Sequence, residues 1–344
     1  MLARRRETDE LRHAAGGRNM TTTSTEQAIG VDIGGTKIRI GLVDRYGNVA
    51  AELAVPSLAK ERRVVEQAIN GIRNVLKMAE EQGKALHLLG IGVGSAGQID
   101  FASGTVRYAN DLLPGYTGTP IRELLEREFS LPVYVDNDVN VLALAEKRFG
   151  SGKHSRHMVC IALGTGVGGA LLSEGQIVRG ATGGAGEIGH MTVDFRGPRC
   201  ICGNRGCLEL YASGTSIERR MNELLKSGEE AGADAPAVPD ARAVFARWRA
   251  GDPTAGQVMD ETAAALGAAI ASLIHIVNPD TIVIGGGVAE SGEDFLAKVR
   301  EEAERRAMPS MYRHVRIEAA SSGNRSGMLG AAQLVFQAPV SHPA

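Results

Sequence analysis

Short apolar runs separated by glycine-rich turns fill the start of the patterned part of the chain. Strands are predicted at residues 29–33, from Lys37 through Val43, and from Val49 onward. Between residues 64 and 83 the apolar positions recur instead at the spacing of one helix face. These elements predict a mixed α/β chain that opens with a meander of short strands.

A second meander of the same kind follows in the middle of the chain. Strands are predicted at residues 157–163 and 168–172, joined by a turn that contains Gly164, Thr165 and Gly166. The order of strand, Gly/Thr turn and strand repeats the first meander. An internal repeat of this kind predicts two similar domains that face each other across a cleft, each offering one phosphate loop to a shared nucleotide.

The remaining pattern predicts further elements between and after the two meanders. We expect the following: a buried strand from residue 88, a helix at 119–129, a strand at 133–136, a helix at 141–149, a helix capped near Ser213 or Thr215, an exposed loop at 227–239, an alanine-rich helix at 263–277, a strand at 281–288 and a final helix at 327–336. Residues 1–27 have no periodicity, and we expect them to be disordered. Met20 is an alternative start.

Composition and charge limit the class of protein but do not indicate a binding partner. The 344 residues are 43% hydrophobic and 23% charged, with a formal net charge of −2, so no basic surface for nucleic acid is indicated. No run reaches the roughly 18 apolar residues of a membrane span, and residues 1–27 contain no apolar core of the kind that a signal peptide has. Three of the four cysteines fall in one short span, which favours a reducing cytoplasm over a secreted disulfide scaffold. We therefore expect a cytoplasmic protein.

That cysteine-rich span is the strongest chemical signal in the sequence. His190, Cys200, Cys202 and Cys207 form the ligand set of a closed structural zinc site. Buried small hydrophobes or disulfide partners are the alternative, but the loop between the cysteines is polar and builds no apolar face. Glu187 and Glu209 flank the span.

The first meander carries a candidate phosphate site. Gly34 and Gly35 let the backbone approach a phosphate, Thr36 and Lys37 add a hydroxyl and a charge, and Asp32 can hold Mg²⁺ through water. Because a strand follows, the segment is neither a Walker A loop nor a dinucleotide fingerprint. A plain hairpin turn is the alternative.

Other candidates are ambiguous from the residues alone. Asp138 follows a strand and precedes a helix, where an N-cap is common. Asn110 lies before a proline in a turn-forming stretch. A triple glycine, Gly285, Gly286 and Gly287, ends a predicted strand and suits either a flexible turn or close approach to a ligand.

Together these motifs resemble the ROK family of bacterial sugar kinases and sugar-responsive repressors. The resemblance implies the actin-like ATPase (ribonuclease H-like) fold, with two α/β domains flanking a cleft: residues 28–137 completed by a helix at about 325–337, and residues 138–324 with the zinc loop at 187–209. It implies that Asp138 is the catalytic base. The sugar would be bound by Asn110, Asn137, Asp138, Glu187, His190 and Glu209, and the nucleotide by the loops at Asp32–Lys37, Gly164–Gly166 and Gly285–Gly287.

The implied activity is the ATP-dependent phosphorylation of the 6-hydroxyl of glucose, with Mg²⁺ and a structural Zn²⁺, in a homodimer or homotetramer. The zinc-loop motif is most similar to that of bacterial glucokinases, but kinases of N-acetylmannosamine, fructose and C7-cyclitols share the frame, and polyphosphate or ADP could be the donor. The loop from Ser95 to Gln98 lacks the family's usual Pro-Gly-Pro. A sugar-sensing regulator is disfavoured, because residues 1–27 are too short for a helix-turn-helix and the base and first phosphate loop are intact.

Overall fold

The structure is a computed structural model that describes residues 26–84, 86–227, 237–288 and 292–338. The strands are β1 (Gln27–Ile33), β2 (Lys37–Asp44), β3 (Val49–Pro56), β4 (Leu88–Ser95), β5 (Gln98–Asp100), β6 (Thr105–Tyr108), β7 (Val133–Asn137), β8 (Met158–Leu163), β9 (Val167–Ser173), β10 (Gln176–Ile177), β11 (Thr281–Gly285) and β12 (Arg316–Ala319). The α-helices are α1 (Val64–Glu81), α2 (Ile121–Phe129), α3 (Asp138–Phe149), α4 (Glu209–Ala212), α5 (Gly214–Ser227), α6 (Ala241–Arg249), α7 (Pro253–Val277), α8 (Glu293–Arg306), α9 (Pro309–Tyr312) and α10 (Ser326–Gln337). Two 3₁₀ turns are η1 (Ile188–His190) and η3 (Gly323–Arg325).

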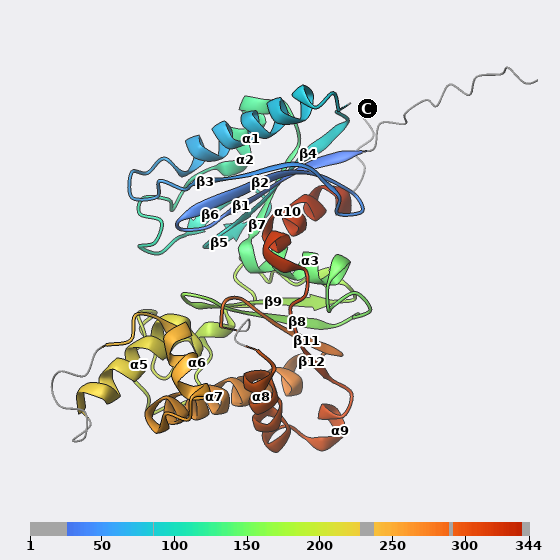
Figure 1. Ribbon diagram of the computed structural model, residues 1–344. Coiled ribbons are helices and arrows are strands. Elements are labelled where there is room, and N and C mark those ends of the chain that lie inside the picture. Colours follow the sequence, from blue (N-terminus) through green and yellow to red (C-terminus); the bar gives the residue numbers. More distant parts are fainter. Residues whose placement is uncertain (1–25, 85, 228–236, 289–291, 339–344) are drawn as a thin grey trace, which may run out of the picture.

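Two five-stranded sheets of the same topology form the body of the molecule. The upper sheet of Figure 1 has the order β3-β2-β1-β4-β7, and the lower sheet has the order β10-β9-β8-β11-β12. In each sheet the first three strands along the chain pair antiparallel, the fourth pairs parallel with the first, and the fifth pairs parallel with the fourth. The repeated order confirms the predicted duplication of the meander. We call the parts built on these sheets the upper half and the lower half.

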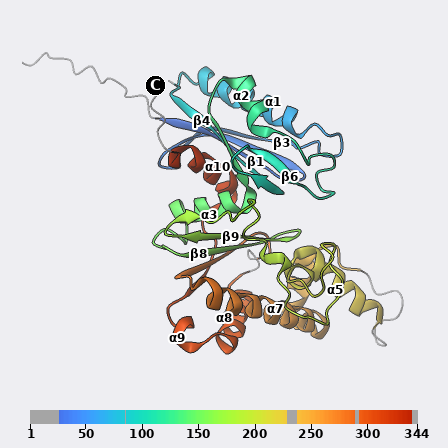
Figure 2. The ribbon, with the colours of Figure 1, turned by 180° about the vertical axis from the view of Figure 1, so that it is seen from behind.

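Two helices lie between the sheets, as both ribbon views show (Figures 1 and 2). Helix α10, although it ends the described chain, packs against α3 and against β1 and β4 of the upper sheet. Glycines allow this close packing: a Cβ on Gly330 would lie 1.7 Å from the carbonyl oxygen of Val141, and one on Gly92 would lie 1.8 Å from that of Ala331. The C-terminal helix therefore completes the upper half. The division of the chain into domains at residues 137 and 324 remains a prediction.

The lower half is built around α7. This helix contacts α4, α5, α6 and α8, and its buried residues form the centre of the lower hydrophobic core. Among the described residues it is the one helix long and apolar enough to cross a membrane, but half of its most apolar window is buried inside the protein. An apolar helix of this kind is expected at the centre of a packed core.

Several expectations need correction. Gln27 was expected to be disordered, but it is buried and begins β1, whereas residues 1–25 lie outside the described residues. The alanine-rich helix begins at Pro253 rather than at residue 263, because Asp252 caps it and accepts hydrogen bonds from two backbone N–H groups. The strand expected at residues 281–288, β11, ends at Gly285.

Candidate active site

The two glycine-rich turns occupy equivalent places in the two halves. The first joins β1 to β2, and there the N–H of Gly34 donates to the carbonyl oxygen of Lys37 at 3.0 Å. The second joins β8 to β9, and there the N–H of Gly164 donates to the carbonyl oxygen of Gly166, also at 3.0 Å. Gly34, Gly35, Gly164, Thr165 and Gly166 line one cavity. The two predicted phosphate loops are thus brought together, while Thr36 and Lys37 are exposed.

Asp138 is the first residue of α3, directly after the edge strand β7 of the upper sheet. The helix cap is its neighbour Asn137, whose Oδ1 accepts from the N–H groups of Val139 at 2.8 Å and Asn140 at 3.3 Å. The Nδ2 of Asn137 donates to the carbonyl oxygen of Gly97 at 3.0 Å. Asn137 thus does the capping that the sequence pattern suggested for Asp138, and it leaves the Asp138 carboxylate facing the cavity.

Burial governs the acidity of this carboxylate. The pKa of Asp138 is raised above its ordinary value, chiefly because burial disfavours the charged form; the N–H of Val139 opposes this shift, and the charge of Glu187 adds to it. The helix N-terminus therefore does not dominate, contrary to the simple expectation from its position. A carboxylate with a raised pKa is a stronger base, which suits proton abstraction from a hydroxyl.

A second carboxylate, Asp32, lies near the end of β1. Its pKa is raised to about 6, first by burial and then by the charge of Asp138, while the charges of Arg39 and Lys37 act in the opposite direction. A Cβ on Gly327, in the first turn of α10, would lie 2.4 Å from this carboxylate. Two mutually repelling, desolvated carboxylates next to phosphate loops form a donor set that suits a hard cation such as Mg²⁺.

The larger of two adjoining cavities, about 390 Å³, lies between the halves and holds the predicted sugar-binding residues. It is lined by Asn110, Asn137, Asp138, Glu187, His190 and Glu209, together with Gly97, Gln98, Tyr108 and Leu112 of the upper half. The Oε2 of Glu209 accepts from the N–H of Val167 at 2.9 Å, and the Oδ1 of Asn110 accepts from that of Leu112 at 3.1 Å. The cavity is thus walled by polar groups that are themselves held in place.

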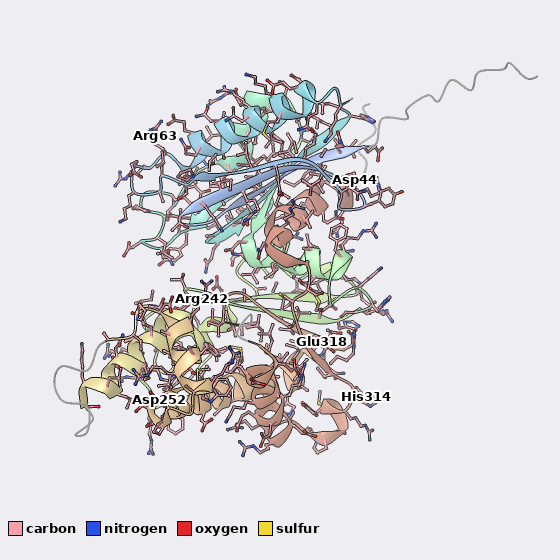
Figure 3. The ribbon with its side chains drawn as sticks, viewed as in Figure 1. Asp44, Arg63, Arg242, Asp252, His314 and Glu318 are labelled. Carbon is pink, nitrogen blue, oxygen red and sulfur yellow. The ribbon has the colours of Figure 1, made fainter. Side chains whose placement is uncertain are left out.

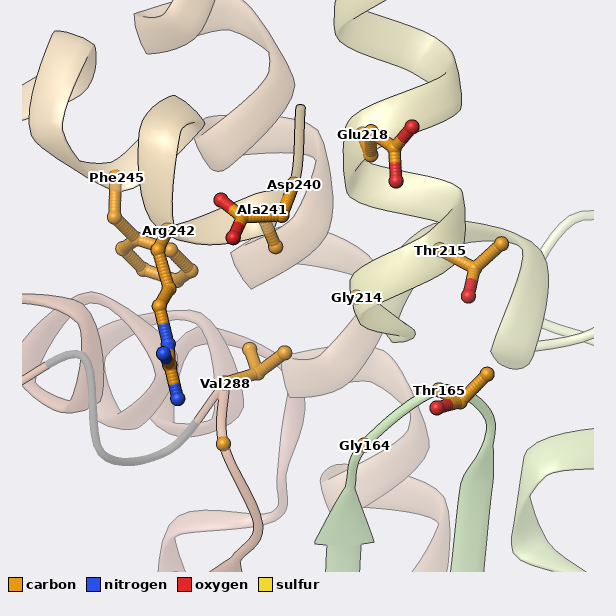
Figure 4. A pocket seen from close by; sticks show the side chains of 11 residues that line it. Gly164, Thr165, Gly214, Thr215, Glu218, Asp240, Ala241, Arg242, Phe245 and Val288 are labelled. Atoms are coloured by element: carbon orange, nitrogen blue, oxygen red, sulfur yellow. The ribbon is translucent and has the colours of Figure 1, made fainter. Parts of the chain in front are cut away.

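The second cavity, of about 330 Å³, adjoins the first and belongs to the lower half. Figure 4 shows α5 along one side, α6 along the other and the β8–β9 turn below them. Phe245 and Arg242 of α6 contribute an aromatic ring and a guanidinium, and Figure 3 places Arg242 on the side of the lower half that faces the upper half. Gly164 and Thr165 line both cavities, so the two adjoin at that turn.

Only part of the triple glycine reaches this cavity. Gly287 lines it, whereas Gly285 is buried in β11. Gly286 has φ of +89°, and a Cβ there would lie 2.4 Å from the carbonyl oxygen of Leu163. Its role is therefore to turn the chain against β8.

The four predicted zinc ligands lie together. The ligand atoms of His190, Cys200, Cys202 and Cys207 are all within 4.8 Å of one another, and the two sulfurs of Cys202 and Cys207 are 3.6 Å apart. A tetrahedral site with Zn–S bonds of about 2.3 Å places sulfurs about 3.8 Å apart, close to the separation here, so the cluster fits zinc. All four cysteines of the protein are free thiols, which argues against the disulfide alternative.

Sequence reasoning missed several residues of the site. Helix α6 was not predicted, and with it Asp240, Arg242 and Phe245 were overlooked, because they belong to no motif and follow a Gly/Ala/Pro-rich stretch. Of the atypical loop, Gln98 lines the larger cavity, but Ser95 does not. Ser95 is fully buried, and its hydroxyl lies 3.2 Å from that of Tyr116.

Comparison with known proteins gives a consistent result. Residues 28–338 match the ROK family. Glucokinase of Thermotoga maritima is 34% identical over 311 residues, which is 89% of this chain and 96% of that protein. The xylose repressor of Caldicellulosiruptor bescii is 32% identical over 321 residues, which is 92% of this chain and 79% of the repressor. A ROK family glucokinase from Streptomyces griseus, solved in complex with glucose and AMPPNP, superposes with a TM-score of 0.74 at 32% identity, covering 91% of this chain and all of that one.

Proposed function

The chain belongs to the ROK family and has its actin-like ATPase fold, and we propose that it is a kinase that transfers the γ-phosphoryl group of ATP to the 6-hydroxyl of glucose. One observation carries the proposal. Two cavities meet at Gly164 and Thr165, and the half-buried Asp138 lines the larger one. A nucleotide in the smaller cavity would thus direct its terminal phosphate toward a hydroxyl beside Asp138.

Asp138 acts as the general base. Its carboxylate accepts the proton of the sugar hydroxyl as the oxygen attacks the γ-phosphorus in line, and ADP leaves with the electrons of the broken P–O bond. The raised pKa of Asp138 makes it an effective acceptor for this proton. The fixed position of Asp138, with Asn137 capping the same helix, lowers the entropic cost of alignment.

The two glycine turns bind the phosphates. Their backbones, at Gly34 and Gly35 in one half and at Gly164–Gly166 in the other, lie on one cavity and can approach the phosphate oxygens closely. Thr36 and Lys37, exposed directly after the first turn, would add a hydroxyl and a positive charge. Asp32 would hold Mg²⁺ through water, and Mg²⁺ when bound neutralises charge that develops on the phosphoryl oxygens.

The sugar hydroxyls are bound by the acidic and polar side chains of the larger cavity. Glu187, His190 and Glu209 come from the segment that contains the zinc cluster, and Asn110 comes from the upper half. The Asn137 amide holds the first turn of α3 through Oδ1 and Gly97 through one N–H of Nδ2, and its second N–H can donate to a sugar hydroxyl. His190, Cys200, Cys202 and Cys207 would hold a structural Zn²⁺, which supplies cross-linking of a polar loop and no catalysis.

In the smaller cavity, Gly287 and Phe245 provide flat surfaces for the nucleoside of ATP.

The proposal of glucose as the substrate rests on the likeness to named glucokinases. N-acetylmannosamine, fructose and C7-cyclitols remain alternative acceptors, and polyphosphate and ADP alternative donors. A coupled ADP-release assay with Mg·ATP against glucose, mannose, fructose, N-acetylated hexosamines and a C7-cyclitol tests the proposal. Turnover dominated by glucose is expected; turnover confined to another acceptor would reassign the substrate.

A sugar-responsive regulator is the second candidate, because the chain is also similar to a repressor. Such a protein would bind sugar without turnover, and binding to DNA would weaken steeply with salt. We propose catalysis instead, in a cytoplasmic homodimer or homotetramer that binds no nucleic acid. Light scattering measures the number of subunits in the assembly, and a gel-shift titration measures whether the protein binds DNA.

A further inference from the structure

A segment of the lower half lies against the upper half beside the larger cavity. This segment, residues 178–187, follows β10 and leads into η1; we call it the strap. It contacts the upper half at three points, through Arg179, Gly183 and Glu187. At its other end the strap meets Gln98 of the upper half. Arg179 and Gln98 are not among the residues described above as binding substrate or metal.

The first point is an ion pair with a buried partner. The Nε and Nη2 of Arg179 donate to Oδ2 of Asp136 at 2.9 and 2.6 Å, and the side chain of Asp136 is only 3% exposed. The guanidinium carbon lies 3.6 Å from the centre of the Phe101 ring. A planar guanidinium that pairs with a carboxylate and stacks on a ring is fixed in orientation, in a way that lysine cannot reproduce.

This ion pair reaches the catalytic helix. The other oxygen of Asp136, Oδ1, accepts from the N–H of Asn137 at 2.8 Å and from the Nδ2 of Asn140 at 2.7 Å. One carboxylate thus joins Arg179 of the strap to the first turn of α3, which presents Asp138.

The other two points lie at the far end of the strap. Gly183 has φ of +83°, and a Cβ there would lie 2.2 Å from the carbonyl oxygen of Ile99, so the two backbones touch. At the strap's end, the Nε2 of Gln98 donates to Oε1 of Glu187 at 3.0 Å. This bond orients Glu187 and leaves its Oε2 available to a ligand. Gln98 belongs to the loop where this chain departs from the usual Pro-Gly-Pro of its family.

We propose that Arg179 and Gln98 are positioning residues that hold Glu187 and Asp138 in one frame: Arg179 acts on Asp138 through Asp136, and Gln98 acts on the sugar through Glu187. The kinetic consequences rest on the proposed kinase function. Loosening Arg179 would misplace the base and lower kcat. Loosening Gln98 would free Glu187 and raise KM for the sugar.

The variants Arg179→Lys and Gln98→Met separate these roles. For Arg179→Lys we expect kcat to fall roughly tenfold or more, with little change in KM for the sugar, because small misplacements of a reacting group are costly. For Gln98→Met we expect KM for the sugar to rise about fivefold at nearly constant kcat, as the loss of one hydrogen bond predicts. Matched controls are Arg156→Lys, in the exposed pair with Glu174, and Gln257→Met, whose Nε2 donates to Glu261 at 3.1 Å on the exposed face of α7.

A double-mutant cycle tests whether Gln98 works through Glu187. In a Glu187→Gln background, Gln98→Met is expected to change KM no further. Additive effects would mean that Gln98 acts independently of Glu187 and would overturn its positioning role. Kinetics for Arg179→Lys that match those of Arg156→Lys would overturn the role of Arg179.

Hydrogen exchange of the sugar-free protein gives a readout that does not require activity. Amides of the strap are expected to exchange several-fold faster in Arg179→Lys and Gln98→Met than in wild type, and at the wild-type rate in the two controls. If the strap amides exchanged at the wild-type rate in both variants, the claim that Arg179 and Gln98 hold the strap would be overturned. If wild-type protein phosphorylated no acceptor, the proposed function would fail, while the exchange data would still decide whether the strap is held as described.

Discussion

The charge of Asp138 raises the pKa of Asp32, although one residue lies on the first strand and the other begins a helix more than a hundred residues later. Their proximity follows from β1, β4 and β7 running parallel as neighbours in one sheet, so that their carboxyl ends meet at one edge. At that edge the fold holds two carboxylates of like charge, a costly arrangement in the absence of a cation.

The raised pKa of Asp32 predicts a pH-dependent stability. The pKa of Asp32 is 3.8 in the unfolded chain and about 6 in the folded protein. Protonation of Asp32 at low pH therefore stabilises the folded state. That contribution is lost as pH rises through 6, and amounts to about 3 kcal/mol at most. Replacing Asp32 with Asn should therefore raise the thermal midpoint of the nucleotide-free protein above pH 6 and have little effect near pH 4. If the difference in thermal midpoint between the two proteins were the same at pH 4 as above pH 6, the account would be contradicted.

The cysteine cluster predicts about one zinc per chain in purified protein. Cys207→Ser should lose the metal, lower the thermal midpoint and raise KM for the sugar, because the loop also carries His190 and Glu209. Elemental analysis and melting measure the first two effects. Cys160→Ala is the matched control, since Cys160 is buried in the lower sheet and should leave the zinc content unchanged. Active wild-type protein without zinc would refute the structural metal.

Glu146 holds the junction between the halves. Its fully buried carboxylate accepts from the backbone N–H groups of Ser151, Ser321 and Ser322, at 2.8 to 3.2 Å, and from the Ser322 hydroxyl. In Glu146→Gln an amide N–H₂ would face N–H donors, so we expect a loss of about 2–4 kcal/mol in stability.

Chemical denaturation measures this loss. Glu223→Gln, in the exposed pair with Arg219, provides a comparison that should change stability by less than about 0.5 kcal/mol. If Glu146→Gln unfolded at the same denaturant concentration as Glu223→Gln, the segment from Ser321 to α10 would have to be held by other contacts.

The sequence was most informative where a local pattern had one physical solution. The glycine turns flanked by apolar strands predicted both meanders, and the spacing of His190 and the three cysteines predicted a cluster that the fold does bring together. A polar loop with four soft ligands has few other ways to fold.

The rest depended on tertiary contacts that no local pattern encodes. Nothing in the sequence near Phe245 indicates that α6 turns this ring toward a cavity. The N-cap could have been either Asn137 or Asp138, since both residues cap well, and only the structure assigns it to Asn137. Likewise the pairing of Arg179 with Asp136 joins residues 43 apart, and neither side chain stands out in its own segment.

The most direct test of the account compares wild type with Asp138→Asn in Mg·ATP and the acceptor that the wild type prefers. We expect kcat to fall by roughly 10³-fold, since the amide cannot take the hydroxyl proton, while calorimetry shows sugar binding within about threefold of wild type. Asp260→Asn, an exposed change on α7, should leave both quantities unaltered. A variant that retained a large part of the wild-type rate, with the sugar bound, would show that Asp138 is not the base.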